Sequence, residues 1–295
     1  MPEGDTLHRT ASVLRAVLLD EPVTAARARP GGAQLARVIG SRIDRVEAVG
    51  KHLLIGFDVG LTLHTHLRME GSWHRYRAGE RWRRSPTRAV AVLEVPRAVA
   101  VCFDAPVVEL LETRALPLHP AIAGLGPDLL ADEPDLDAAV SRLLDPSRKS
   151  LTIGEALLDQ TAAAGIGNVY RSEVLWAVQV SPFTAVGAVG IETMRSLVQT
   201  AAAFLRANVG TPFRTTMPDA LGGPPVSHGP RRGRPRLAVY GRVGRPCPRC
   251  GSLVRADIIG ELPRRVYWCP TCQAIHPRTV SRVGIPADAP GDPAR

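Results

Sequence analysis

The amino-acid sequence predicts an α+β protein in which a β-sandwich comes first, a helical domain follows, and a small metal-binding ribbon lies near the end. Three observations predict this fold. Short apolar runs separated by Gly, Pro and Asp fill residues 1–125. A helical apolar period begins near Asp135, and four of the five cysteines form two C-x2-C pairs late in the chain. A length of 295 residues also fits two or three domains.

The first domain, residues 1–125, is predicted to open with a helix over 6–19, because Leu7, Leu14 and Val17 recur near a 3.6-residue period. Strands are then expected in an antiparallel sandwich at 38–49, 53–57, 61–66, 90–95 and 99–103. The charged segment 75–88 is expected to be a surface loop. Cys102 lies within an apolar run and is expected to be an inert core thiol.

The second domain, residues 135–210, is predicted to be helical over 136–144, 155–164, 169–178 and 190–208. Gly165 suits a left-handed helix end, and Asn168 suits the N-cap of the next helix. Free amides at that helix start would form an anion site, with Gly167 leaving room for a phosphate. A purely structural helical hairpin has the same glycine pattern, so this segment alone does not decide the function.

The rest of the chain is predicted to be a linker, a ribbon and a tail. Residues 211–236 are rich in Pro, Gly and Arg, which indicates a flexible linker or a loop that orders on DNA. The ribbon, a zinc finger, is expected over residues 237–276. The final residues, 281–295, are expected to be a disordered tail.

The ribbon carries Cys247, Cys250, Cys269 and Cys272 in the spacing C-x2-C, 18 residues, C-x2-C. This pattern is typical of a tetrahedral zinc held by four thiolates, with a hairpin made from 254–259 and 265–268. An iron–sulfur cluster and a dithiol redox pair are the alternatives. Since the protein fills all four ligand positions, the metal is expected to be structural.

The charge indicates a polyanionic partner. Lys+Arg 37 against Asp+Glu 28 gives +9 and a sequence pI of about 10.0. A solvated basic surface is the plainer alternative. Only Lys51 and Lys149 among the 37 Lys and Arg residues are lysines. Because arginine fills the other positions, each lysine is a candidate for chemistry that arginine cannot perform. No signal peptide and no apolar run of roughly 18 residues is visible, which predicts a cytosolic protein.

Three features together resemble the formamidopyrimidine-DNA glycosylase and endonuclease VIII family. They are Met1-Pro2-Glu3-Gly4, Leu158-Asp159-Gln160 leading into Gly165-Ile166-Gly167-Asn168-Val169-Tyr170, and the ribbon ending Cys269-Pro270-Thr271-Cys272-Gln273. The resemblance implies an N-terminal β-sandwich, a helix–two-turn–helix domain and a zinc finger, with damaged DNA between the halves. It implies a bifunctional DNA glycosylase and AP lyase of base excision repair, acting as a monomer in the bacterial cytosol.

The same resemblance implies roles for individual residues. Removal of Met1 would expose the secondary amine of Pro2 as the nucleophile that attacks C1′ of the damaged nucleotide. Glu3 would be the general acid/base. Lys51 would contact a DNA phosphate and transfer a proton near the lesion. Lys149 is interpreted as a surface charge.

Four further residues are implied in DNA binding. Asn168 and Arg264 would pinch the phosphates that flank the extruded nucleotide. Within His66-Leu67-Arg68-Met69-Glu70-Gly71, Met69 would be the apolar wedge that fills the gap, with Arg68 beside it.

Two departures narrow or complicate the resemblance. The 8-oxoguanine branch carries an arginine pair after Asp-Pro, whereas residues 103–109 here contain no arginine. With Gly4 after Pro-Glu, this favours the endonuclease VIII branch, which prefers oxidised pyrimidines and cleaves by β,δ-elimination. Position 6 is Thr6 where many members have an acid, and Asp5 is the candidate substitute.

Two other functions compete with this one. A non-catalytic zinc-ribbon DNA-binding protein of the same fold would keep the ribbon and the basic surface. An RNA-binding, ribosome-associated protein would explain the charge and the ribbon but not Pro2-Glu3.

Overall fold

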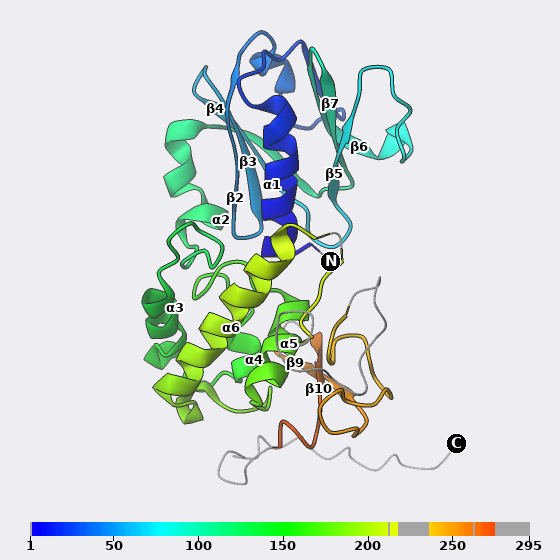
Figure 1. The fold of residues 1–295 in the computed structure, drawn as a ribbon. Coiled ribbons are helices and arrows are strands. Elements are labelled where there is room, and N and C mark those ends of the chain that lie inside the picture. The colour runs from blue at the N-terminus through cyan, green and yellow to red at the C-terminus, as the bar shows by residue number, and fades with distance from the viewer. Residues whose placement is uncertain (1, 212, 218–235, 262, 275–295) are drawn as a thin grey trace, which may run out of the picture.

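The computed structural model describes residues 2–211, 213–217, 236–261 and 263–274. Figure 1 shows two lobes. The upper lobe contains the strands of the sandwich and α1, and the lower lobe contains the remaining long helices and the ribbon with β9 and β10. The N-terminus lies at the junction between the lobes. This arrangement confirms the predicted α+β fold with an N-terminal sandwich, a helical domain and a C-terminal ribbon.

The sandwich consists of two four-stranded antiparallel sheets. One has the order β2-β3-β4-β8, made of Ile43–Val49, His52–Phe57, Leu61–His66 and Val107–Glu112. The other has the order β1-β6-β7-β5, made of Ala25–Ala28, Ala89–Val95, Ala98–Phe103 and Ser72–Tyr76. The sequence did not indicate β1, β5 or β8, and β5 overlaps the segment that was expected to be a loop.

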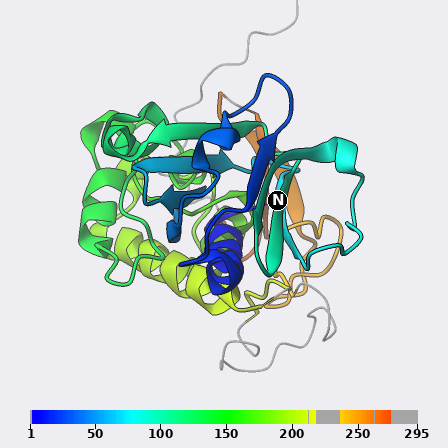
Figure 2. The ribbon, with the colours of Figure 1, turned by 90° about the horizontal axis from the view of Figure 1, so that it is seen from above.

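The helix α1, Gly4–Leu18, packs its apolar face against strands of both sheets. Figure 2, seen from above, shows α1 beside the sheets and next to α6. Leu7 and Leu14 of the helix share one core with Leu53 and Leu93 of the two sheets. Cys102 is buried in the same core, and burial raises the pKa of its thiol, which agrees with an inert core cysteine.

Apart from α1, the described residues form five helices and five 3-10 turns. The helices are α2 Pro120–Ala123, α3 Leu136–Leu143, α4 Ile153–Ala156, α5 Asn168–Val178 and α6 Ile191–Val209. The 3-10 turns are η1 Leu35–Val38, η2 Pro86–Arg88, η3 Thr113–Leu118, η4 Pro146–Arg148 and η5 Val186–Ala188. Among the described residues, no helix is both long and apolar enough to cross a membrane.

The predicted helix over 155–164 is wrong, because α4 ends at Ala156. Side chains after it bond to the backbone and compete with the helix. The Asp159 carboxylate accepts the N–H of Thr161 at 2.9 Å. The Gln160 amide donates to the carbonyl of Ile166 at 3.0 Å and accepts the N–H of Gly165 at 3.1 Å. Residues 157–167 therefore form a turn-rich segment that leads into α5.

The ribbon consists of β9, Arg255–Ile259, paired antiparallel with β10, Arg264–Trp268. It is fastened to α5 by the buried carboxylate of Glu173, which accepts the backbone N–H groups of Ala238, Val239 and Tyr240 at 2.7–2.9 Å. The hydroxyl of Thr216 donates to the same carboxylate. Residues 214–217 are thus half-buried or buried rather than free as the sequence suggested, while 218–235 and 281–295 lie outside the described residues.

Candidate active site

A cavity of about 570 Å³ lies where the sandwich meets the lower lobe. It contains every catalytic and DNA-binding residue that the sequence singled out: Pro2, Glu3, Lys51, Arg68, Met69, Asn168 and Arg264. These residues come from the N-terminus, the β2–β3 hairpin, the loop between β4 and β5, the start of α5 and the ribbon. Residues up to 262 positions apart in sequence therefore face one space.

Glu3 is fully buried, and its carboxylate lies at the N-terminal end of α5. One oxygen accepts the N–H of Val169 at 2.8 Å, and the other accepts those of Gly167 at 2.9 Å and Tyr170 at 3.3 Å. These N–H groups have no partner inside the helix, and helix N-termini favour negative groups. The predicted N-cap role of Asn168 is wrong, because Gly167 is the N-cap residue and Glu3 supplies the capping acceptor.

The half-buried Pro2 is placed by the contacts of the residues that follow it. Gly4 donates its backbone N–H to the carbonyl of Gly165 at 3.0 Å, and Gly4 and Gly165 approach so closely that a Cβ on Gly4 would lie 3.0 Å from the Gly165 Cα. Together with the Glu3 carboxylate, this contact fixes the chain start on the segment before α5. The nitrogen of Pro2 consequently has a defined position relative to Glu3.

Gly167→Ala should destabilise the protein, because its Cβ would overlap the Cδ and Cγ atoms of Glu3. Overpacking of this kind costs about 1–3 kcal/mol. Thermal unfolding should show a clear decrease in Tm. Gly190→Ala is the matched control, since Gly190 is also a helix N-cap and an added Cβ meets nothing within 4 Å there. Equal Tm values for the two variants would contradict the packing described for Glu3.

Lys51 lies in the turn of the β2–β3 hairpin and is half-buried at the cavity wall. Its ammonium donates to the carbonyl of Ile166. Burial lowers the pKa of Lys51 from 10.5 to about 8; Glu3 opposes this effect, and Arg264 adds to it. At neutral pH the group is charged but close to titration, which suits both phosphate contact and proton transfer.

Asp128 holds the hairpin turn that carries Lys51. Its carboxylate accepts the N–H of Gly50 at 2.7 Å, that of Leu130 at 2.9 Å and a nitrogen of His8 at 3.1 Å. Burial opposes ionisation, but these hydrogen bonds outweigh it and lower the pKa of Asp128. Gly50 has φ +56°, which favours glycine, and so the turn can meet the lower lobe closely.

Asp5, the candidate for the missing second acid, is buried in an ion pair with Arg214. Arg214 donates from Nε and Nη2 to the two carboxylate oxygens at 2.7 and 2.6 Å, and Nη2 also donates to the Thr6 hydroxyl at 2.8 Å. Asp5 is not among the described residues that line the cavity. Its role in the described structure is to join α1 to the segment after α6.

The loop after β4 presents Arg68 and Met69 to the cavity. Arg68 has φ +49°, a left-handed conformation that turns the loop outward. Met69 is 62% exposed. An exposed methionine at the cavity mouth agrees with the expected place of an apolar wedge.

Asn168 and Arg264 face the cavity from α5 and β10. The Asn168 amide donates one N–H to the carbonyl of Arg265 at 2.9 Å, and its oxygen accepts from Arg171. The Asn168 side chain also forms a hydrogen bond with the side chain of Tyr240. The same contacts fasten the ribbon hairpin to α5.

Several further residues line the cavity without a role assigned from the sequence, among them His66, Gln160 and Arg171. His66 and Gln160 lie inside the motifs quoted in the sequence analysis, and Arg171 directly follows one of them, so their place in or beside these motifs was the available signal. Arg171 is fully buried and donates to the carbonyls of Gly154 and Arg265 at 3.2 and 3.1 Å. Burial lowers the pKa of His66 to about 4, so its ring is neutral at neutral pH.

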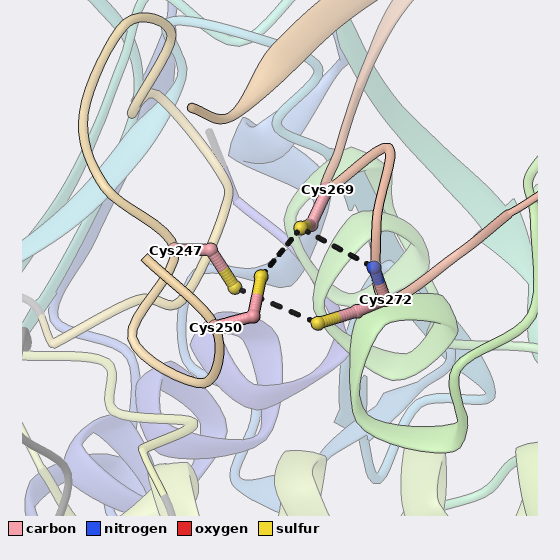
Figure 3. Close-up of side chains that lie close together, drawn as sticks. All are labelled: Cys247, Cys250, Cys269 and Cys272. Atoms are coloured by element: carbon pink, nitrogen blue, oxygen red, sulfur yellow. Dashed lines mark hydrogen bonds between the residues drawn. The ribbon is translucent and has the colours of Figure 1, made fainter. Parts of the chain in front are cut away.

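The four ribbon cysteines converge on one point (Figure 3). The sulfurs of Cys250 and Cys269 lie 3.5 Å apart, and those of Cys247 and Cys272 lie 3.9 Å apart. Tetrahedral zinc with Zn–S bonds of about 2.3 Å requires sulfurs about 3.8 Å apart. The cluster therefore fits a single metal ion bound by four thiolates.

Comparison with known proteins agrees with this geometry. Residues 1–106 match the formamidopyrimidine-DNA glycosylase N-terminal domain, and residues 125–217 match the H2TH domain of the same glycosylases. The chain is 38% identical over 290 residues to a probable endonuclease 8 2 of Streptomyces coelicolor, covering 97% of this chain and 99% of that protein. The chain belongs to the formamidopyrimidine-DNA glycosylase and endonuclease 8 family.

Other members of the formamidopyrimidine-DNA glycosylase and endonuclease 8 family show the same full-length agreement. The DNA-(apurinic or apyrimidinic site) lyase Nei2 of Mycolicibacterium smegmatis is 38% identical over 274 residues, covering 92% of this chain and 99% of that one. Among solved structures, MutM (Fpg) of Thermus thermophilus has a TM-score of 0.73 at 28% identity, covering 94% of this chain and 100% of that one. Lactococcus lactis Fpg bound to N7-benzyl-Fapy-dG DNA, at 21% identity, shares the fold, with a TM-score of 0.74 and coverage of 93% and 100%.

Proposed function

We propose that this chain is a DNA glycosylase with AP lyase activity, and that it removes oxidised pyrimidines. The observation that carries the proposal is the convergence of Pro2, Glu3 and Lys51 in one cavity of a family member. The pyrimidine preference rests on the segment after β7, where residues 105–109 contain no arginine to read a purine. Asp104, which directly precedes this segment, forms ion pairs with Arg84 and Arg88.

The chemistry is covalent catalysis by an amine. The Pro2 nitrogen forms a bond to C1′ while the N-glycosidic bond breaks and its electron pair leaves with the base, which takes up a proton. Ring opening of the sugar gives an iminium between Pro2 and C1′. Loss of a C2′ proton then drives elimination of the 3′ phosphate, and a second elimination releases the 5′ phosphate. A one-nucleotide gap with phosphate at both ends results.

Glu3 and Lys51 are placed to move the protons of these steps. The Glu3 carboxylate adjoins the nucleophile and is held by the N-terminus of α5, so it acts from a fixed position as general acid/base. Lys51, with a pKa of about 8, exchanges a proton more readily than an ordinary lysine and contacts a phosphate while charged. The nucleotide must leave the duplex to reach them, and Met69 is the exposed side chain available to fill the gap.

A lesion panel tests the proposed function. Duplexes with an oxidised pyrimidine, 8-oxoguanine or an abasic site are incubated with one purified preparation, and the products are separated by size. We expect incision of the oxidised-pyrimidine and abasic duplexes and much weaker incision of 8-oxoguanine DNA. DNA binding without incision of any duplex would favour the non-catalytic alternative, and preferred cleavage at 8-oxoguanine would overturn the lesion class alone.

The proposed contacts of Asn168 and Arg264 with the DNA phosphates can be tested by the salt dependence of binding. Arg264→Ala should weaken DNA binding across sequences and reduce the slope of log K against log salt by about 1, because one charged phosphate contact is lost. Asn168→Ala should weaken binding but leave the slope unchanged, since an amide releases no counterion. Fluorescence anisotropy at several salt concentrations measures both effects.

The matched control for Arg264 is Arg195→Ala, which removes an exposed α6 arginine paired with Glu192. Its slope should equal that of the unaltered protein. An unchanged slope in the Arg264 variant would refute the phosphate contact of Arg264 but not the fold.

We also propose that the four ribbon cysteines hold a structural zinc. Cys247, Cys250, Cys269 and Cys272 fit the metal in number, type and spacing. Zinc there supplies folding free energy to the ribbon, about 10–16 kcal/mol in zinc-finger peptides. The protein then holds Arg264 toward the cavity through a folded β9–β10 hairpin.

Removing the metal should unfold the ribbon and abolish DNA binding. In Cys269→Ser, we expect less than one zinc per chain, a loss of DNA affinity and a red shift of tryptophan fluorescence. The shift is expected because Trp176 is buried and donates its ring N–H to the Cys247 sulfur at 3.3 Å. Cys102→Ala, in the sandwich core, is the control and should retain zinc and binding. A Cys269 variant that binds DNA normally would refute the structural role.

A further inference from the structure

We propose that the outer face of the β2-β3-β4-β8 sheet carries a second metal site, for a divalent transition ion such as zinc, cobalt or nickel. The ligands are His64, Glu109 and His119. One nitrogen of each histidine and one carboxylate oxygen of Glu109 lie within 4.8 Å of one another. The site is separate from the ribbon and from the catalytic cavity, none of whose lining residues it contains.

The sheet register brings the three ligands together. His64 of β4 is paired directly with Glu109 of β8, so the two side chains leave the same face. His119 follows η3 and returns to that face. The Glu109 Oε2 lies 2.9 Å from Nδ1 of His64 and 3.3 Å from Nε2 of His119. Tetrahedral zinc with bonds of about 2.0–2.1 Å places neighbouring ligand atoms about 3.3 Å apart, so these separations need little adjustment.

The surroundings of His64 also suit a metal ligand. Its ring is 1% exposed, and its Nε2 lies 2.8 Å from Nδ1 of His52. A ligating imidazole nearly always donates its other N–H to a fixed acceptor, which sets the tautomer. With the metal on Nδ1 of His64, Nε2–H would donate to His52 and complete such a pair.

The ligand set defines the class of ion. Two imidazoles and one carboxylate suit Zn²⁺, Co²⁺, Ni²⁺ and Cu²⁺, whereas Mg²⁺ and Ca²⁺ prefer all-oxygen sites. Glu109 is 43% exposed, so water has access to the fourth position. His119 is less exposed, and its Nδ1 has no hydrogen-bond partner among the described residues. An ion at Nε2 would take the place of the direct contact between that nitrogen and Glu109.

The site is connected to the cavity through the rings of His52 and His66. His52 follows Lys51 in sequence, and its ring lies 4.8 Å from that of His66. His66 lines the catalytic cavity. An ion on His64 would fix the ring of His52. It would thereby restrict the ring of His66, which lines the cavity.

Metal stoichiometry tests the proposal. The full-length protein with its ribbon metal is dialysed against Co²⁺, passed through a desalting column and analysed for metal per chain. We expect one cobalt in addition to the ribbon ion, with visible d–d absorption but no sulfur-to-cobalt charge-transfer band. Excess Mg²⁺ should not displace the cobalt, whereas Ni²⁺ and Cu²⁺ should, following the Irving–Williams order.

Variants assign the ion to the three ligands. Glu109→Gln combined with His119→Gln should eliminate the additional cobalt, while the ribbon ion remains. His74→Gln is the control, because His74 lies in the other sheet and bonds to Ser72 and Tyr76, and it should retain the additional ion. Circular dichroism checks that each variant folds; if the double variant does not, Glu109→Gln alone should at least lower cobalt retention.

Three results would overturn the proposal. The first is no additional cobalt in the unaltered protein. The second is cobalt that shows a thiolate charge-transfer band together with an equal loss of ribbon metal. The third is additional cobalt that persists at full stoichiometry in the folded Glu109 and His119 variant.

Discussion

Blocking the amine of Pro2 is expected to abolish covalent trapping of the protein on damaged DNA. Sodium borohydride should reduce the iminium between Pro2 and C1′ to a stable protein–DNA crosslink on abasic or oxidised-pyrimidine duplexes. An N-terminal extension that retains Met1 turns the Pro2 nitrogen into an amide, whose lone pair is delocalised and does not attack. The crosslink should fall to the background of denatured protein.

Pro2→Gly provides the second arm of this test. The variant keeps a terminal amine but loses the ring that fixes its direction, so trapping should also be lost while DNA binding is largely retained. Peptide mapping of the reduced adduct identifies the reacting residue. The alternative nucleophile is Lys51, the other amine that lines the cavity. A crosslink on Lys51, or full trapping by the blocked protein, would refute the Pro2 mechanism without affecting the fold.

Lys51→Met is expected to make the protein more stable and inactive. The folded state holds a buried ammonium with a pKa of about 8 against 10.5 for an ordinary lysine, a difference equivalent to about 3 kcal/mol. Methionine has similar length and no charge to desolvate. The carbonyl of Ile166 would keep a partner, because Gln160 also donates to it at 3.0 Å. Urea unfolding at pH 7 should therefore show a gain of up to about 3 kcal/mol, with loss of incision.

The pH dependence separates this explanation from a general packing effect. Below pH 8, both folded and unfolded protein carry the charge, and the folded state bears the desolvation penalty in full. Between pH 8 and 10.5, the unfolded state binds more protons, so the unaltered protein gains stability as pH rises and the advantage of Lys51→Met shrinks. Lys149→Met, at an exposed position, is the control and should change stability little. An advantage that is the same at pH 7 and pH 10 would contradict the buried charge.

Features formed by residues close together in the sequence could be predicted from local sequence patterns. The C-x2-C pairs predicted the four-sulfur cluster, and the segment after Gly165 predicted the start of α5 to within one residue. Apolar runs gave the buried strands β3, β4, β6 and β7. The edge strands β1 and β8 carry polar and half-buried residues, and β5 contains Arg75 within a charged stretch, so their apolar signal was weak.

Long-range contacts could not be predicted from the sequence. Asn168 has the residue type of an N-cap, but the capping carboxylate comes from Glu3, 164 residues earlier. Arg214 lies in a stretch whose composition is typical of a linker, yet it is held by Asp5 at the other end of the chain. Both contacts depend on α1 meeting the lower lobe, which no local pattern encodes. Proximity of the seven cavity residues followed only from the resemblance to a family.

The capping of α5 by Glu3 has a consequence for biosynthesis. Glu3, next to the proposed nucleophile, is synthesised 164 residues before Gly167, the N-cap residue whose N–H its carboxylate binds. At about 5–20 residues per second, this delay is roughly 8–33 s. During that time the N-terminus has no α5 to bind and is accessible to the aminopeptidase that must remove Met1 in the proposed mechanism. Once Glu3 binds the start of α5, the terminus is held there, so this interval gives the aminopeptidase time to act before the site is assembled.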